Sequence, residues 1–126
     1  MGPEAGDVFC YVTTTGRRTG KPHTIEIWYA RSGGAMYVIA QAGERADWVR
    51  NLLADPSVVV RVGGDEWPAR ARPVHDEEER GRAGRAVAAR YQGWTEGSPL
   101  PAWLGAALPV ALEPGAPPED DETMRR

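Results

Sequence analysis

The sequence is poor in cysteine, histidine and lysine, and it has no long apolar run. A single cysteine, Cys10, excludes an intrachain disulfide and a cysteine-rich zinc site. His23 and His75 are too far apart to give a metal-binding spacing, so we expect no metal. No segment approaches the roughly 18 apolar residues of a membrane-spanning helix, and the N-terminal residues do not resemble a signal peptide. We therefore expect a cytoplasmic protein that does not contact a membrane.

The overall composition is that of an ordinary globular domain. The chain has 126 residues, 41% of them hydrophobic and 26% charged, which suits one domain with a core of its own. The net charge of −3 argues against general nucleic-acid binding. Cys10 stands in an apolar segment and is predicted to be a small core residue rather than a nucleophile.

The hydrophobic pattern predicts a mainly β fold with helices (α+β). Alternating and β-branched segments predict strands over residues 8–15, 24–31, 36–40, 57–62, 66–74 and 108–112. Helical spacing predicts helices over 45–54 and 76–91, and 93–107 is expected to be a long loop or a short helical piece. Because the strands follow one another as hairpins without an early crossover, we expect a small antiparallel barrel. It would occupy residues 1–113, and 114–126 would form a disordered acidic tail.

A basic, glycine-containing loop over residues 13–23 lies between the first two expected strands and reads Thr-Thr-Thr-Gly-Arg-Arg-Thr-Gly-Lys-Pro-His. Its glycines permit a tight turn that exposes backbone N–H groups. Arg17, Arg18 and Lys21 add positive charge, with no carboxylate between Gly16 and Pro22 to neutralise it. This composition favours an anion-binding loop, and a solvated hairpin turn is the alternative.

Three further motifs follow the loop in order. They are the aromatic pair Trp28-Tyr29, the turn Gly33-Gly34 and the segment 47–60, which reads Asp-Trp-Val-Arg-Asn-Leu-Leu-Ala-Asp-Pro-Ser-Val-Val-Val. With the loop, they make the chain resemble the deazaflavin-dependent nitroreductase family, strongly over 9–62 and again at 91–94 and 108–114. The resemblance implies a split β-barrel related to the FMN-binding and pyridoxamine-phosphate-oxidase barrels.

The resemblance also implies coenzyme F420, a 5-deazaflavin whose side chain bears a phosphate and a glutamate tail. Arg17 and Arg18 would hold the phosphate or the tail carboxylates, and Lys21 would add a charge. The helix predicted from residue 45 would present its N-terminal N–H groups to the coenzyme, and its Trp48 and Asn51 match family positions at the pocket. The implied cofactor-binding residues are Thr15, Gly16, Arg17, Arg18, Thr19, Gly20, Lys21, His23, Gln41, Ala42, Trp48 and Asn51.

The implied reaction is hydride transfer from reduced deazaflavin to a small electron-poor acceptor of quinone, nitroaromatic or enone type. Because the coenzyme carries the chemistry, the protein would bind, orient and exclude water. Trp28 and Tyr91 are the expected catalytic residues beside the acceptor, while Tyr29 and Trp94 are expected to be core. The proton would come from a side chain or from water, and the protein would be a monomer or a homodimer.

The sequence departs from the family pattern at His23, Gln41 and Ala42, where characterised relatives have arginine, serine and lysine. Lys21 or Arg45 would offset the missing lysine. Two alternatives remain. One is an FMN-using split-barrel oxidoreductase, or a protein that binds a flavin or deazaflavin without turnover. The other is a module that binds nucleic acid or another anion, which the acidic remainder of the chain disfavours.

Overall fold

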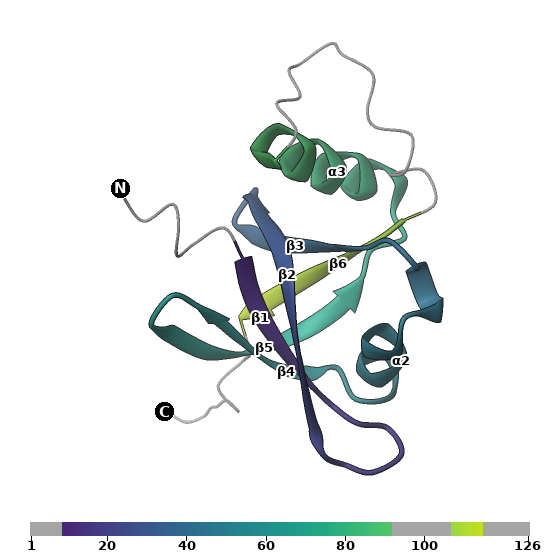
Figure 1. Cartoon of the computed structure of the whole chain (residues 1–126). Coiled ribbons are helices and arrows are strands. Elements are labelled where there is room, and N and C mark those ends of the chain that lie inside the picture. The colour runs from purple at the N-terminus through teal and green to yellow at the C-terminus, as the bar shows by residue number, and fades with distance from the viewer. Residues whose placement is uncertain (1–8, 92–106, 115–126) are drawn as a thin grey trace, which may run out of the picture.

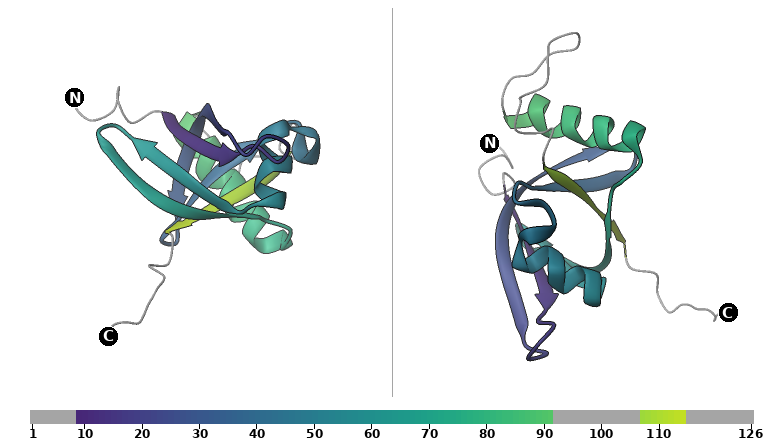
Figure 2. Two further views of the ribbon diagram at one scale, coloured as in Figure 1. Left: turned by 90° about the horizontal axis from the view of Figure 1, so that it is seen from below. Right: turned by 90° about the vertical axis from the view of Figure 1, so that its right-hand side faces the viewer.

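The fold is a closed antiparallel barrel to which two α-helices are attached (Figures 1 and 2). The computed structural model describes residues 9–91 and 107–114, without the side chain of Tyr91. Within these residues the strands follow the order β1-β2-β3-β6-β5-β4, and β4 pairs with β1 to close the barrel. Their bounds are β1 Phe9–Thr15, β2 Pro22–Ser32, β3 Ala35–Ala40, β4 Ser57–Val62, β5 Asp65–Pro73 and β6 Leu108–Pro114. The predicted mainly β barrel is confirmed.

Glycine turns connect the hairpins at the positions expected from the sequence. Gly33 and Gly34 have φ values of 61° and 83° between β2 and β3, and Gly63 has φ 59° between β4 and β5. These left-handed conformations favour glycine over residues with a Cβ atom. The local sequence therefore determines where each of these strands turns.

The strand ladder extends several elements beyond their predicted bounds. The pairing of Thr14 with His23 and of Thr15 with Pro22 makes β2 begin at Pro22, two residues before the expected start. At the other end of the chain, Glu113 pairs with Arg70, and β6 continues to Pro114. The predictions for residues 1–8, 92–106 and 115–126, including the long loop and the disordered tail, lie outside the described residues.

Helix α2 (Asp47–Ala54) follows β3 through a short 3₁₀ helix, η1 (Gly43–Arg45). The predicted helix therefore begins two residues later than expected, because Gly43 has φ 64° and the turn of η1 comes first. Val49 and Leu52 are buried against the barrel, whereas Leu53 is 52% exposed. In two views α2 lies beside the β1–β2 loop, at the end of the barrel away from α3 (Figures 1 and 2).

The core fills the inside of the barrel with small and branched side chains. Cys10, Val12, Val38, Val60 and Val110 are each fully buried, at 0% exposure. Burial raises the pKa of the Cys10 thiol to about 12, so the thiolate is disfavoured. Cys10 is a core residue, as expected.

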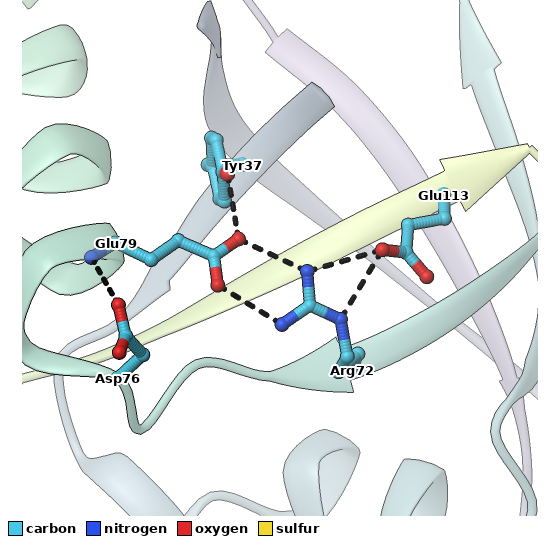
Figure 3. Close-up of polar contacts among 5 residues, drawn as sticks. All are labelled: Tyr37, Arg72, Asp76, Glu79 and Glu113. Carbon is cyan, nitrogen blue, oxygen red and sulfur yellow. Dashed lines mark hydrogen bonds and ion pairs between the residues drawn. The ribbon is translucent and has the colours of Figure 1, made fainter. Parts of the chain in front are cut away.

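Helix α3 (Glu77–Tyr91) covers β2 and β3. A cluster of polar side chains attaches the N-terminal part of this helix to the barrel (Figure 3). Arg72 donates from Nη1 and Nη2 to the Glu79 carboxylate at 3.0 and 2.9 Å, and Tyr37 donates its hydroxyl to the same group at 2.7 Å. Arg72 also reaches Glu113 at 3.0 Å, while Asp76 accepts the Glu79 backbone N–H at 2.9 Å. The cluster thus joins β3, β5, β6 and α3.

Candidate functional site

The β1–β2 loop closes on itself through its own backbone. The N–H of Gly16 donates to the carbonyl of Lys21 at 2.8 Å, and the N–H of Gly20 donates to the carbonyl of Gly16 at 2.8 Å. The Lys21 N–H donates to the Thr19 hydroxyl at 3.2 Å. The N–H groups of Gly16 and Gly20 therefore serve the turn itself and hold it in one shape. The expectation that the loop exposes backbone N–H groups does not hold for these two glycines, and anion binding by the loop stays a prediction.

Gly16 allows a close approach that a larger residue would prevent. A Cβ atom there would lie 2.7 Å from Nε2 of His23 and 3.1 Å from the carbonyl oxygen of Lys21. Both separations are tighter than ordinary van der Waals contact, so the ring of His23 covers the space that a side chain would need. The ring of His23 therefore lies close against Gly16.

Asn51 of α2 fixes the loop from the opposite side. It is only 5% exposed, and its Oδ1 accepts from the Arg17 backbone N–H at 3.2 Å and from Arg17 Nη1 at 2.8 Å. Its Nδ2 donates to the hydroxyl of Thr14, which is 1% exposed, at 3.2 Å. The side chain of Asn51 is therefore committed to protein contacts on both of its polar atoms.

Arg17 has a carboxylate partner that the loop sequence did not reveal. Its Nη2 lies 3.4 Å from Oδ1 of Asp47, and its Nη1 donates to the Asp47 carbonyl at 3.4 Å. The expectation that the loop charge is unneutralised is wrong for Arg17, because the counter-ion comes from a distant helix. Arg18 is exposed and has no hydrogen bond or ion pair to any residue of the described part of the chain.

A pocket of about 450 Å³ opens between the loop, the start of β2 and α2. We call it the basic pocket. Its walls are formed by Gly16, Arg17, Arg18, Thr19, His23, Thr24, Ile25, Asp47, Trp48 and Asn51. The loop and the helix, which are about 30 residues apart in sequence, meet here as the resemblance implied.

Other implied cofactor residues lie outside the basic pocket. Thr15 pairs with Pro22 at the end of β1, Gly20 has φ 75° at the exposed turn, and Lys21 is exposed. Ala42 is exposed and precedes η1. The basic pocket therefore includes most but not all of the implied set, and the cofactor-binding roles of the whole set stay predictions.

A second pocket, of about 320 Å³, lies farther along β2 beneath α3. We call it the apolar pocket. It is lined by Phe9, Glu26, Ile27, Trp28, Ile39, Gln41 and Val87. Trp28 is 42% exposed, and its ring centroid lies 6.3 Å from that of Phe9. Gln41, expected at the cofactor, is thus placed with Trp28.

The remaining aromatic candidates divide into core and undescribed residues. Tyr29 is 3% exposed, and the guanidinium of Arg90 lies 4.4 Å from its ring centroid, so the expectation of a core role is confirmed. Tyr91 ends α3, but its side chain and all of Trp94 lie outside the described residues. The catalytic role of Tyr91 stays a prediction.

The described residues contain neither a metal-ligand cluster nor a membrane-spanning helix. Over residues 9–91 and 107–114, no three histidine, cysteine, aspartate or glutamate side chains are grouped to hold a metal ion. No helix in the same ranges combines the length and apolar character needed to cross a membrane.

Sequence reasoning missed several residues of the two pockets. Asp47 is four residues before Asn51, so helical spacing places both on one face, and this signal was available. Thr24 and Ile25 were read only as strand residues. Glu26, Ile39 and Val87 carry no motif, because the apolar pocket exists only when β1, β2, β3 and α3 come together.

The barrel order and the attached helices define a split β-barrel, and solved structures support this class. A putative pyridoxamine 5'-phosphate oxidase from Listeria innocua superposes with a TM-score of 0.63 and 16% identity, covering 89% of this chain and 87% of that one. The conserved hypothetical protein Rv2991 from Mycobacterium tuberculosis gives a TM-score of 0.72 and 24% identity, covering 84% of this chain and 72% of that one. At these identities the likeness shows the fold alone.

A family model for the F420H2-dependent quinone reductases matches residues 5–103. The chain belongs to this family, which confirms the resemblance to deazaflavin-dependent reductases. The F420H2-dependent quinone reductase Rv1261c of Mycobacterium tuberculosis is 37% identical over an alignment of 70 residues that covers 52% of this chain and 47% of that protein. The chain thus spans about half the length of the relatives that it matches.

Proposed function

We propose that the protein is an F420H2-dependent reductase that passes a hydride to a small electron-poor acceptor such as a quinone, a nitroaromatic compound or an enone. The observation that carries the proposal is the basic pocket, where the loop and α2 bring together Arg17, Arg18, Trp48 and Asn51. Membership of the F420H2-dependent quinone reductase family supports the same coenzyme and, among these acceptors, quinones.

The residues of the basic pocket suit the anionic side chain of a deazaflavin. Arg17 is held by Asn51 and by the Asp47 carbonyl, and its Nη2 also contacts the exposed Asp47 carboxylate. Its guanidinium is thereby preoriented for a phosphate or a carboxylate. Arg18 stands exposed at the same wall and would add a second guanidinium. The preorganised loop lowers the entropy cost of binding, because its backbone hydrogen bonds are already made.

The apolar pocket suits the acceptor. Residues 23–25 of β2 line the basic pocket, and residues 26–28 line the apolar pocket. At about 3.3 Å per residue, Thr24 and Ile27 are roughly 10 Å apart along the strand. The coenzyme, which is anionic at one end and aromatic at the other, would follow β2 from the basic pocket towards the apolar pocket. The acceptor would bind in the apolar pocket, where Trp28 would stack on its ring.

When bound, reduced coenzyme F420 would supply the hydride, and the chain would supply position and shelter. Arg17 and Arg18 would anchor the charged end, and Asn51 would keep Arg17 in place. Trp28 and Phe9, whose rings are tilted by 35° to each other, would exclude water from the acceptor, and the acceptor ring would stack on Trp28. In this account no nucleophilic side chain is needed, and the proton arrives from solvent or from a side chain beside the acceptor.

The test is a titration followed by a turnover assay. The purified protein should bind coenzyme F420 more tightly than FMN, and it should oxidise the reduced form in the presence of menadione. F420 is first reduced by a separate reductase, and the loss of the absorbance of oxidised F420 shows that the reduced form has been made. When the protein and menadione are then added, the return of this absorbance reports turnover. Co-purification of FMN together with no measurable binding of F420 would overturn the proposal.

A further inference from the structure

Asp47 is the one carboxylate among the described residues that line the basic pocket. Its neighbours there include Arg17, Arg18 and His23, so it stands against the prevailing charge of the site. The ion pair to Arg17 is 3.4 Å long, and the side chain of Asp47 is 87% exposed, against 23% for Arg17. Such an exposed pair contributes little to stability.

The geometry does not need Asp47 to hold Arg17 in place. Asn51 accepts the shorter bond from Nη1, at 2.8 Å, and the backbone carbonyl of residue 47 accepts another. The main effect of the Asp47 carboxylate is therefore its negative charge, and it contributes little to the position of Arg17. An anion bound to the outer N–H groups of Arg17 must share that guanidinium with Asp47 and is repelled by it.

We propose that Asp47 sets the charge selectivity of the basic pocket, favouring phosphodiester and carboxylate groups, with one charge each, over a terminal phosphate with close to two. The inference rests on the proposed function, because it concerns the same pocket. A phosphate monoester carries about −1.5 to −2 at pH 7, since its second pKa is about 6. At ~6 Å in water, the Coulomb law gives roughly a threefold loss of affinity for each ligand charge.

The consequence is discrimination between two flavin-like coenzymes. The side-chain phosphate of a deazaflavin that continues into a glutamate tail is a diester, whereas FMN ends in a phosphate monoester. Repulsion from Asp47 would lower FMN affinity by roughly tenfold and the affinity for the diester by roughly threefold. Asp47 would thus be a specificity-determining residue that rejects FMN.

The test compares wild type, Asp47→Asn and Glu66→Gln. Glu66 is an exposed residue of β5 outside both pockets, so its variant removes the same charge elsewhere. Dissociation constants are measured for F420, FMN and riboflavin, which lacks the phosphate. Asp47→Asn should tighten FMN by about tenfold, F420 by about threefold and riboflavin not at all, while Glu66→Gln should leave all three unchanged.

Equal gains for FMN and riboflavin, or for FMN and F420, would overturn the inference while leaving the proposed function standing. A gain for FMN no larger in Asp47→Asn than in Glu66→Gln would overturn it as well. If wild type binds no F420, the proposed function fails. The FMN and riboflavin measurements would then still decide whether Asp47 repels a phosphate monoester.

Discussion

The side-chain oxygen of Asn51 accepts two hydrogen bonds from Arg17, one from the backbone N–H at 3.2 Å and one from Nη1 at 2.8 Å. One buried amide therefore fixes both the path of the loop and the direction of its first guanidinium. Because the Asn51 Nδ2 also bonds to Thr14, the same residue joins β1, the loop and α2. The shape of the basic pocket depends on this contact.

Replacement of Asn51 by alanine should lower both stability and coenzyme affinity. Thr14, at 1% exposure, would lose its hydrogen-bond partner, and Arg17 would lose its anchor. We expect the free energy of unfolding in urea to fall by about 1–3 kcal/mol. Leu53→Ala is the control on the same helix, because Leu53 is 52% exposed. An Asn51→Ala protein with unchanged stability and unchanged F420 affinity would contradict the role of this contact.

Variants of Arg18 and Lys21 distinguish a positive charge that lines the basic pocket from one that lies only in the same loop. Arg18 lines the basic pocket and is exposed, so Arg18→Ala should weaken F420 binding by about 1.5–3 kcal/mol with little effect on unfolding. Lys21 lies in the same loop but outside the pocket lining, and Lys21→Ala should change affinity much less. Calorimetric titration of both variants measures the difference. Equal losses would mean that the loop acts only through its overall charge.

Gly16→Ala tests the close approach between the loop and His23. The new Cβ would lie 2.7 Å from His23 Nε2 and 3.1 Å from the Lys21 carbonyl, so the ring or the turn must shift. We expect weaker F420 binding and a changed chemical shift of the His23 ring protons. Gly64→Ala is the matched control, because no atom lies within 4 Å of a Cβ built there. A Gly16→Ala protein indistinguishable from Gly64→Ala would refute the steric argument.

Features of the fold and of the site that depend on neighbouring residues could be predicted from the sequence, whereas contacts between distant residues could not. The hairpin turn at Gly33-Gly34 and the strand at 57–62 follow from neighbouring residues, and the structure confirms both. The meeting of the loop with Trp48 and Asn51 was inferred only through the family resemblance. The pairing of Arg17 with Asp47 was missed, because residues 30 apart in the chain carry no local signal of contact.

Glu79 should make stability depend on pH at the acid end. Hydrogen bonds from Arg72 and Tyr37 lower the pKa of Glu79 to about 2. An unfolded glutamate titrates near pH 4.3, so the folded state favours the ionised form. The contribution is therefore fully present above about pH 4.3 and is lost as the pH falls towards 2. Urea unfolding at a series of pH values measures it.

The matched pair for this prediction is Glu79→Gln and Glu78→Gln. Glu78 is exposed on the same turn of α3, whereas Glu79 joins Tyr37 and Arg72. Glu79→Gln should lower the free energy of unfolding at pH 7 by about 1–3 kcal/mol and flatten its change between pH 4.3 and 2. If Glu78→Gln flattened the profile equally, the effect would belong to the helix terminus and not to the cluster.

Trp28 should affect the acceptor and leave the coenzyme anchor intact. Its ring lies in the apolar pocket beside Phe9, away from the basic pocket that would hold the charged side chain of F420. Loss of an aromatic contact of about 0.5–1.5 kcal/mol predicts a decrease in kcat/KM for menadione of roughly twofold to tenfold in Trp28→Leu. The dissociation constant of F420 should stay within twofold of wild type, within the precision of about 0.4 kcal/mol. Trp67→Leu, at a tryptophan outside both pockets, controls for the loss of an indole. A fall in F420 affinity with kcat/KM unchanged would place the coenzyme ring, and not the acceptor, against Trp28.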